Sequence, residues 1–364
     1  MRASRWLLFW GLVVLGVGAA AYLVASFNPA ETWRIIFHSG PYGFAIFFVN
    51  YFAVILIQTV GWDLLLRAAG HRIPFRWLLT AMLMGFVGNF VTPSMYVGGE
   101  PIRAYFIGAK FHIAKRRVMG TIVLHKFLEF TGFLVAMVAC GAVTVAAYDL
   151  PAPVKIVMGT ADIILAAVFV ALAVSFFRNA QVTVRVCRFL AGAGIGRGFF
   201  TRLGDKARDM EQLIHETVTL RWPTTLLSLL LTGGTQLLVV LKAPIFLWVA
   251  PGAPAVPTAG YALLYVLTQI VLIFQFTPGG LGVFEGGEVA IFRQLGMAAP
   301  LAMGYAAFTR GADLLVVAAG TALLVHYGLL GLLRKLLAPG EGEGTGPDSD
   351  TPTGPAKGSE DHHS

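Results

Sequence analysis

The chain contains six apolar runs long enough to cross a membrane, whose hydrocarbon core of about 30 Å takes roughly 20 helical residues. Its composition agrees, with 57% hydrophobic and only 13% charged residues, whereas soluble domains carry about 25% charged residues. One water-soluble core cannot hide so much apolar surface. The sequence therefore predicts an all-α, polytopic membrane protein. The six runs are Trp6–Phe27, Tyr42–Leu66, Val118–Tyr148, Ile156–Phe177, Pro223–Ala250 and Ala298–Leu333.

The first run has a basic start and an Ala-rich end, as a signal peptide does, but its apolar stretch is too long for one. We therefore expect an uncleaved first span. The segment after Pro339 is rich in Gly, Pro, Ser, Asp and Glu, which is typical of disorder. The expected domains are an integral membrane domain over 1–337, with repeats at 1–148 and 156–337 and a basic connector at 178–222, followed by a disordered cytoplasmic tail at 338–364.

Two shorter apolar stretches, Trp77–Val91 and Tyr261–Phe276, are each followed by a break and a second apolar segment. They continue as NFVTPSMYVGGEPIRAYFI (Asn89–Ile107) and QFTPGGLGVFEGGEVAIF (Gln275–Phe292). Pro stops a helix and Gly permits positive φ, so each stretch predicts a helix–break–helix that enters and leaves the membrane by one face. Two kinked spans are the alternative, which would make eight spans. The residues of the breaks are Pro93, Gly98, Gly99, Pro278, Gly279, Gly280 and Gly282.

The two broken stretches resemble each other in sequence. Each has a side-chain amide, Phe and Thr-Pro, then a Gly-Gly-Glu triplet (Gly98–Glu100 and Gly286–Glu288). Each also precedes a basic residue with an acidic one three positions on, as Lys126/Glu129 and Arg310/Asp313. Lys126 lies 33 positions after Pro93, and Arg310 lies 32 after Pro278. The ordered match indicates an internal duplication.

The placement of Lys and Arg predicts the orientation of the chain, because cytoplasmic loops carry the basic excess. With both termini in the cytoplasm, the basic loops at 67–76, 110–117 and 178–221 fall on the cytoplasmic side. Each half then holds three spans and one hairpin, and an odd number of spans inverts the second half. We expect six full spans in two inverted repeats, a plan typical of secondary transporters. Thr201–Leu220 is amphipathic and is interpreted as a surface helix or as a solvated connector.

Ionisable residues at mid-bilayer are costly and therefore mark functional positions. Lys126/Glu129 and Arg310/Asp313 each place opposite charges on one helix face. They predict a polar path for a charged group, and the alternative is a structural pair that neutralises itself.

Further polar residues lie at the hairpin breaks. Glu100 and Arg103 lie at the start of a half-helix whose positive end favours an anion. The Arg103 guanidinium can form a bidentate pair of hydrogen bonds with a phosphate. Glu285, in the other break, either caps backbone N–H groups or binds a cationic head group. His125 either relays protons or packs in the core. Lys242 is interpreted as snorkelling to the interface without a role.

At these residues the chain resembles the flippase-like integral membrane family that includes the transmembrane region of lysylphosphatidylglycerol synthases. The resemblance covers roughly Trp6–Leu333 and rests on GGEPIRAYFIGAK (Gly98–Lys110), HKFLEFTGF (His125–Phe133) and TPGGLGVFEGG (Thr277–Gly287). It implies movement of lipids or lipid-linked head groups between leaflets. No counterpart of the soluble aminoacyl-transferase domain is recognisable, so lysyl transfer is not implied. The functional positions that the resemblance implies are Pro93, Gly98, Gly99, Glu100, Arg103, Lys126, Glu129, Pro278, Gly279, Gly280, Gly282 and Glu285.

Three functions compete at this point. The leading hypothesis is a translocase for an anionic phospholipid, or a polyprenyl- or hopanoid-type lipid, in the inner membrane. The second is an ion-coupled transporter of a small anionic solute, and the third is a membrane-embedded enzyme acting on lipid phosphates. The sequence has no Walker A loop, nucleophile elbow or metal triad. We therefore expect no catalytic residues, no metal, no cofactor and no nucleic-acid partner. The path residues would be Glu100, Arg103, Lys126, Glu129, Glu285, Arg310 and Asp313.

Overall fold

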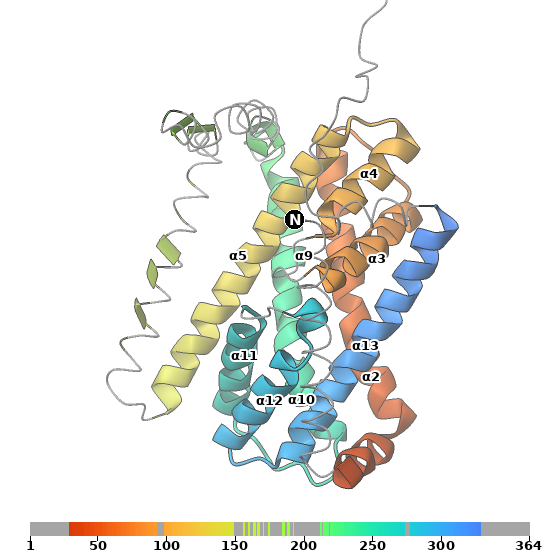
Figure 1. The fold of residues 1–364 in the computed structure, drawn as a ribbon. Coiled ribbons are helices and arrows are strands. Elements are labelled where there is room, and N and C mark those ends of the chain that lie inside the picture. The colour runs from red at the N-terminus through yellow and green to blue at the C-terminus, as the bar shows by residue number, and fades with distance from the viewer. Residues whose placement is uncertain are drawn as a thin grey trace, which may run out of the picture.

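The computed structural model describes residues 29–92, 98–148, 219–273 and 277–328, with scattered positions between 156 and 217. Every regular element in these ranges is a helix, as the ribbon in Figure 1 shows. The predicted all-helical class is therefore confirmed. Several predicted segments lie wholly or largely outside the described residues. They are the spans Trp6–Phe27 and Ile156–Phe177, the surface helix Thr201–Leu220 and the tail at 338–364.

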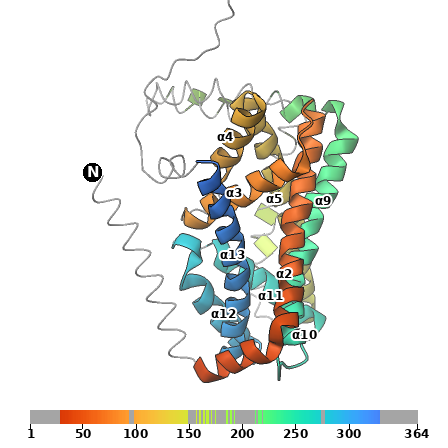
Figure 2. The ribbon, with the colours of Figure 1, turned by 90° about the vertical axis from the view of Figure 1, so that its right-hand side faces the viewer.

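Four long apolar helices form the frame of the molecule. They are α2 (Pro29–Ala68), α5 (Lys115–Ala147), α9 (Trp222–Val240) with its continuation α10 (Lys242–Val249), and α13 (Ala299–His326). Each is long and apolar enough to cross a membrane. Helix α9 packs against both α2 and α5, and α13 packs against α2. Figures 1 and 2 show these helices running between the two ends of the molecule.

The helix boundaries differ from the predicted runs where Pro and Gly intervene. Helix α2 begins at Pro29, before the predicted run, and bends at Gly40 (φ 66°), which is followed by Pro41. The run at 223–250 divides at Leu241, because Pro244 has no N–H to bond the carbonyl of Val240. Helix α13 ends at His326 instead of Leu333, since Gly328 adopts φ 67°.

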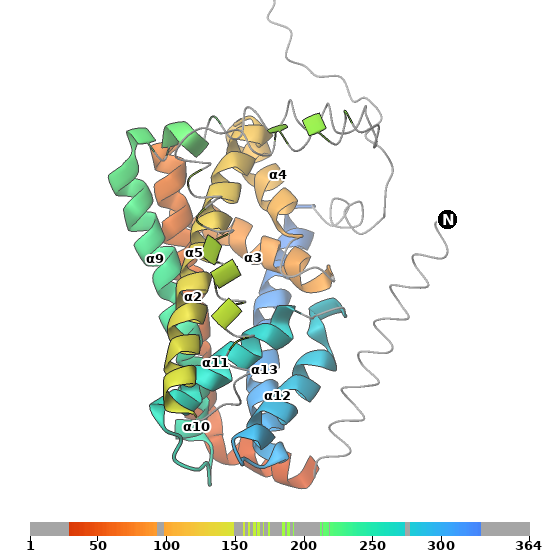
Figure 3. The ribbon, with the colours of Figure 1, turned by 90° about the vertical axis from the view of Figure 1, so that its left-hand side faces the viewer.

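Two pairs of short helices lie at opposite ends of the frame. Helices α3 (Phe75–Val91) and α4 (Glu100–Phe111) lie at the end where α2 stops and α5 starts, and α11 (Thr258–Ile273) and α12 (Val283–Gln294) lie at the other end (Figures 1 and 3). With 12 to 17 residues, each is too short to span 30 Å. This arrangement supports two helix–break–helix units over two kinked spans. The inverted repeat itself stays a prediction.

The two units meet at their tips. In the second break, η1 (Pro278–Gly280) precedes Gly282, and Gly279, Gly280 and Gly282 all have positive φ. The ring of Phe90, at the end of α3, lies against Gly279, where a Cβ atom would come within 2.6 Å of it. Only a glycine combines this backbone conformation with this contact. The tips therefore touch in the interior of the molecule, between the two ends.

The two largest apolar clusters among the described residues form two cores, one toward each end of the frame. Phe47, Phe246, Tyr305 and Phe308 belong to the first core and meet edge-to-face, with ring centroids 5.2 to 6.2 Å apart. The second core surrounds Trp62 and joins α2, α3, α4 and α5. Both cores hold the short helices against the frame, and this fixes the positions of the polar side chains described next.

Single cysteines should test which ends of the frame face the two sides of the membrane. In a protein without Cys140 and Cys187, Ala114→Cys (α4–α5 link) should react with a membrane-impermeant thiol reagent from the cytoplasm, and Ala255→Cys (α10–α11 link) from outside. Both positions are exposed, so neither change disturbs packing. Gly99 is unsuitable, because a Cβ there would strike the backbone of Gly85. Labelling of both cysteines from one side would contradict the arrangement.

Candidate functional site

Four charged residues of α4 and α5 form what we call the first cluster, namely Glu100, Arg103, Lys126 and Glu129. Lys126 Nζ lies 3.0 Å from Glu129 Oε2 and 3.9 Å from Glu100 Oε1. Lys126 therefore links its own helix to the start of α4. The side chains of Lys126 and Glu129 are 32% and 31% exposed among the described residues, whereas that of Glu100 is 13% exposed. The cluster is thus open on the α5 side and closed on the α4 side.

The first break is held by hydrogen bonds from backbone N–H groups. The N–H of Gly98 donates to Glu100 Oε2 (2.8 Å), and the N–H of Gly99 donates to Asn89 Oδ1 (2.6 Å). Side-chain acceptors thereby satisfy donors that no helix can satisfy at this point. The carboxylate of Glu100 also lies at the positive end of α4, which favours it. Pro93, the other predicted residue of this break, lies outside the described residues.

Arg103 is the most unusual member of the first cluster, because it is only 4% exposed yet incompletely hydrogen-bonded. Its Nε and Nη2 atoms have no hydrogen-bond partner among the described residues. The guanidinium lies over the ring of Trp62, 4.1 Å from the centroid. Gly85 makes room for its stem, since a Cβ there would lie 2.8 Å from Arg103 Cγ. A buried cation with unused donors is suited to bind an anion.

Three charged residues of α12 and α13, together with Tyr51 of α2, form what we call the second cluster. Arg310 Nε lies 2.7 Å from Glu285 Oε1, and Arg310 Nη1 lies 3.3 Å from Asp313 Oδ2. The hydroxyl of Tyr51 donates to Asp313 Oδ1 (2.5 Å). All three charged side chains are at most 15% exposed. The second cluster is therefore more buried than the first.

The two clusters have the same arrangement of contacts around a glutamate. Glu285 Oε2 accepts the N–H of Gly282 (2.6 Å), as Glu100 accepts that of Gly98, and each glutamate also pairs with the basic residue of a following long helix. Of the two interpretations of Glu285, the capping of a backbone N–H group is confirmed and is combined with an ion pair to Arg310, and the binding of a cationic head group stays a prediction. The match of Gly98–Glu100 with Gly286–Glu288 was in the wrong register, since the structural counterpart of Glu100 is Glu285.

The clusters lie at similar depths from opposite ends of the frame. Lys126 is 11 positions from the start of α5, and Arg310 is 11 positions from the start of α13. At 1.5 Å per residue, each lies about 16 Å along its helix. Since α5 and α13 start at opposite ends, the clusters approach the middle of the molecule from both sides (Figure 1).

Sequence reasoning missed Tyr51, assigned no role to Lys242 or Glu288, and left the role of His125 open. Tyr51 gave no signal, because nothing in α2 shows that it faces a residue 262 positions away. Lys242 lies beside the second cluster, since its Nζ is 4.5 Å from the centroid of the Tyr51 ring. Glu288 is fully buried. His125 is 1% exposed and its Nε2 contacts Gln58 O (2.9 Å), which favours packing over a proton relay.

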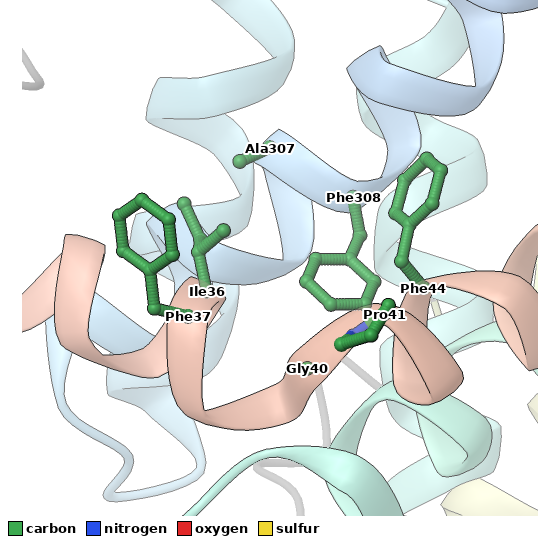
Figure 4. A pocket seen from close by; sticks show the side chains of 7 residues that line it. All are labelled: Ile36, Phe37, Gly40, Pro41, Phe44, Ala307 and Phe308. Atoms are coloured by element: carbon green, nitrogen blue, oxygen red, sulfur yellow. The ribbon is translucent and has the colours of Figure 1, made fainter.

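A separate groove lies at the bend of α2, against α13. Its volume is about 280 Å³, and Figure 4 shows Phe37, Pro41, Phe44 and Phe308 among the seven residues that line it. None of the seven is charged or belongs to either cluster. The groove is therefore lined by apolar residues and is separate from both clusters.

The chain is similar in sequence to a known family of membrane proteins. The family described as the lysylphosphatidylglycerol synthase TM region matches residues 8–320. A UPF0104 membrane protein of Methanothermobacter thermautotrophicus is 23% identical over 324 residues, which cover 87% of this chain and 95% of that protein. A second UPF0104 membrane protein of the same organism is 23% identical over 335 residues, covering 87% and 93%. No solved structure matches the chain.

Proposed function

This chain belongs to the family of the lysylphosphatidylglycerol synthase TM region, and we propose that it moves an anionic, phosphate-bearing lipid or lipid-linked head group between the leaflets of the membrane. We place it in the inner (plasma) membrane with both termini in the cytoplasm, as the distribution of Lys and Arg predicts. The head group would cross through the polar interior while the acyl chains stay in the bilayer. The protein would act as a carrier and not as an enzyme.

Arg103 is the observation that carries this proposal. A buried guanidinium with two unpartnered nitrogens provides donors that match phosphate oxygens. It lies in the first turn of the half-helix α4, whose positive end also favours an anion. Lys126 and Glu129, each about one-third exposed, line the open side of the same cluster. We propose that a head group approaches Arg103 from this side.

The second cluster supports passage beyond the first. Its charges are held in a network of ion pairs and hydrogen bonds, so they replace part of the hydration that a head group loses inside the membrane. The tips of the two helix–break–helix units touch at Phe90 and Gly279. Small movements of these tips would open one cluster or the other. No nucleotide-binding motif is present in the sequence, so we propose that movement is downhill or coupled to an ion.

A vesicle assay tests the proposal. Purified protein in phosphatidylcholine vesicles should expose an acyl-chain-labelled fluorescent phosphatidylglycerol of the inner leaflet to an impermeant quencher, faster than in protein-free vesicles. Labelled phosphatidylcholine should move more slowly, because its head group has no net charge. Uptake of radiolabelled inorganic phosphate measures the alternative substrate in the same vesicles.

The outcomes of this assay separate the candidate functions. Accelerated exposure of phosphatidylglycerol supports lipid translocation. Phosphate uptake without lipid exchange would instead favour the carrier of a small anion. Unchanged exchange of every anionic lipid tested would overturn the proposed function.

A further inference from the structure

Glu288 of α12 is a buried carboxyl group that the proposed path does not use. It is 0% exposed. Its Oε1 atom accepts a hydrogen bond from the hydroxyl of Thr268 on α11 (2.8 Å). Its Oε2 atom is buried and has no hydrogen-bond partner among the described residues. One oxygen of this carboxyl group is therefore hydrogen-bonded, and the other has an unused hydrogen-bonding capacity.

The charges around Glu288 do not balance it. On its own helix, Glu285 is acidic and already pairs with Arg310. Tyr305, on the neighbouring helix α13, is titratable but carries no positive charge, and Thr268 on α11 is neutral. Within the described part of the chain, no Lys or Arg forms an ion pair with Glu288. Burying an unpaired carboxylate away from water costs a large free energy. The surroundings of Glu288 therefore favour a carboxyl group that carries a proton.

The position of Glu288 relative to Arg103 adds a second argument. Glu100 and Glu285 each follow the Pro of their Thr-Pro pair by seven positions, and Arg103 and Glu288 each follow those glutamates by three. The two half-helices thus carry a buried cation and a buried acid at equivalent positions. One suits an anionic head group and the other suits a proton.

We propose that Glu288 takes up and releases one proton for each anionic lipid moved, which makes the protein a proton-coupled lipid carrier. This inference rests on the proposed function. The proton would come from water on the side to which the second helix–break–helix unit opens, and it would bind Oε2 of Glu288. After the carrier opens to the other side, the proton would return to water there. Movement of a singly charged lipid with one proton transfers no net charge, so a membrane potential would not oppose it.

A pH difference across vesicles tests the coupling. Vesicles should hold labelled phosphatidylglycerol, a pH difference of about one unit, and a membrane potential clamped at zero with potassium and valinomycin. With one proton per lipid, the ratio of labelled lipid between the leaflets should shift by up to about tenfold, and reversing the gradient should reverse the shift. Glu288→Gln should leave this ratio near its value without a gradient. Glu31→Gln, at the partly exposed start of α2, is the matched control and should respond as the wild type does.

Infrared spectroscopy gives a measurement that does not depend on transport. The wild-type protein at neutral pH should show the carbonyl band of a protonated carboxyl group, and Thr268→Val should move this band to higher frequency by removing its hydrogen bond. Lipid exchange that ignores the pH difference, or absence of the band, would overturn this inference and leave the proposed function standing. Absence of any lipid exchange in the wild type would overturn both.

Discussion

Arg310→Met is expected to lower the free energy of unfolding by about 3–5 kcal/mol, the usual cost of breaking a buried ion pair. Arg310 joins Glu285 and Asp313 at 2.7 and 3.3 Å, and its side chain is only 15% exposed. The variant leaves two buried carboxylates with Lys242 as the remaining neighbouring cation. The measurement is thermal or chemical unfolding of purified protein in detergent, together with the yield of folded protein.

Two further variants show whether the lost stability comes from unpaired buried charge or from lost packing. Arg34→Met removes an exposed ion pair with Glu31 (3.5 Å, side chains 62% and 40% exposed) and should change stability by less than about 1 kcal/mol. Arg310→Met combined with Glu285→Gln and Asp313→Asn should recover much of the loss, because no unpaired buried carboxylate remains. If Arg310→Met were as stable as Arg34→Met, the second cluster would not be a buried ionic network.

Arg103→Met is expected to slow lipid translocation by about tenfold to a hundredfold. A hydrogen bond to a charged group contributes about 1.5–3 kcal/mol, and each 1.4 kcal/mol is a factor of ten. The Met side chain retains the apolar contact with Trp62 and the space beside Gly85. The rate of phosphatidylglycerol exposure in vesicles measures the effect.

The stability of Arg103→Met distinguishes binding from structure. Two nitrogens of Arg103 have no partner among the described residues, so their removal breaks no hydrogen bond there, and Lys126 still pairs with Glu100 and Glu129. We therefore expect nearly unchanged stability and a partial rescue by Arg103→Lys. Arg76→Met is the control, because Arg76 also lies over a ring, that of Trp77 (5.2 Å), but is exposed. A loss of stability as large as the loss of transport would assign Arg103 a structural role.

The ion pairs within single helices could be predicted from the sequence, and those between helices could not. Spacing of three along a helix places Lys126 beside Glu129 and Arg310 beside Asp313 in any fold that keeps the helices. The partners Glu100 and Glu285 come from other helices, 26 and 25 positions away along the chain. Their approach depends on how each half-helix is rotated and seated, which helical periodicity does not specify.

The register of the two breaks shows the same limit. Alignment of the two sequence motifs pairs Glu100 with Glu288, because both end a Gly-Gly-Glu triplet. The structure pairs Glu100 with Glu285, because the carboxylate must reach both a free N–H of the break and the basic residue of the next long helix. Glu288 lies one turn further on and is fully buried. Sequence alignment alone does not show which carboxylate meets those two conditions.

The sequence by itself determined that this chain is a helical membrane protein with two interrupted helices. Apolar length, Pro and Gly act locally, through hydration and backbone geometry, and need no distant partner. Only the tertiary structure decided that Tyr51 joins the second cluster, that Lys242 lies over its ring and that Arg103 is buried over Trp62. Those contacts depend on packing between helices that the chain brings together from far apart. Packing is a property of matched surfaces, which no single stretch of sequence contains.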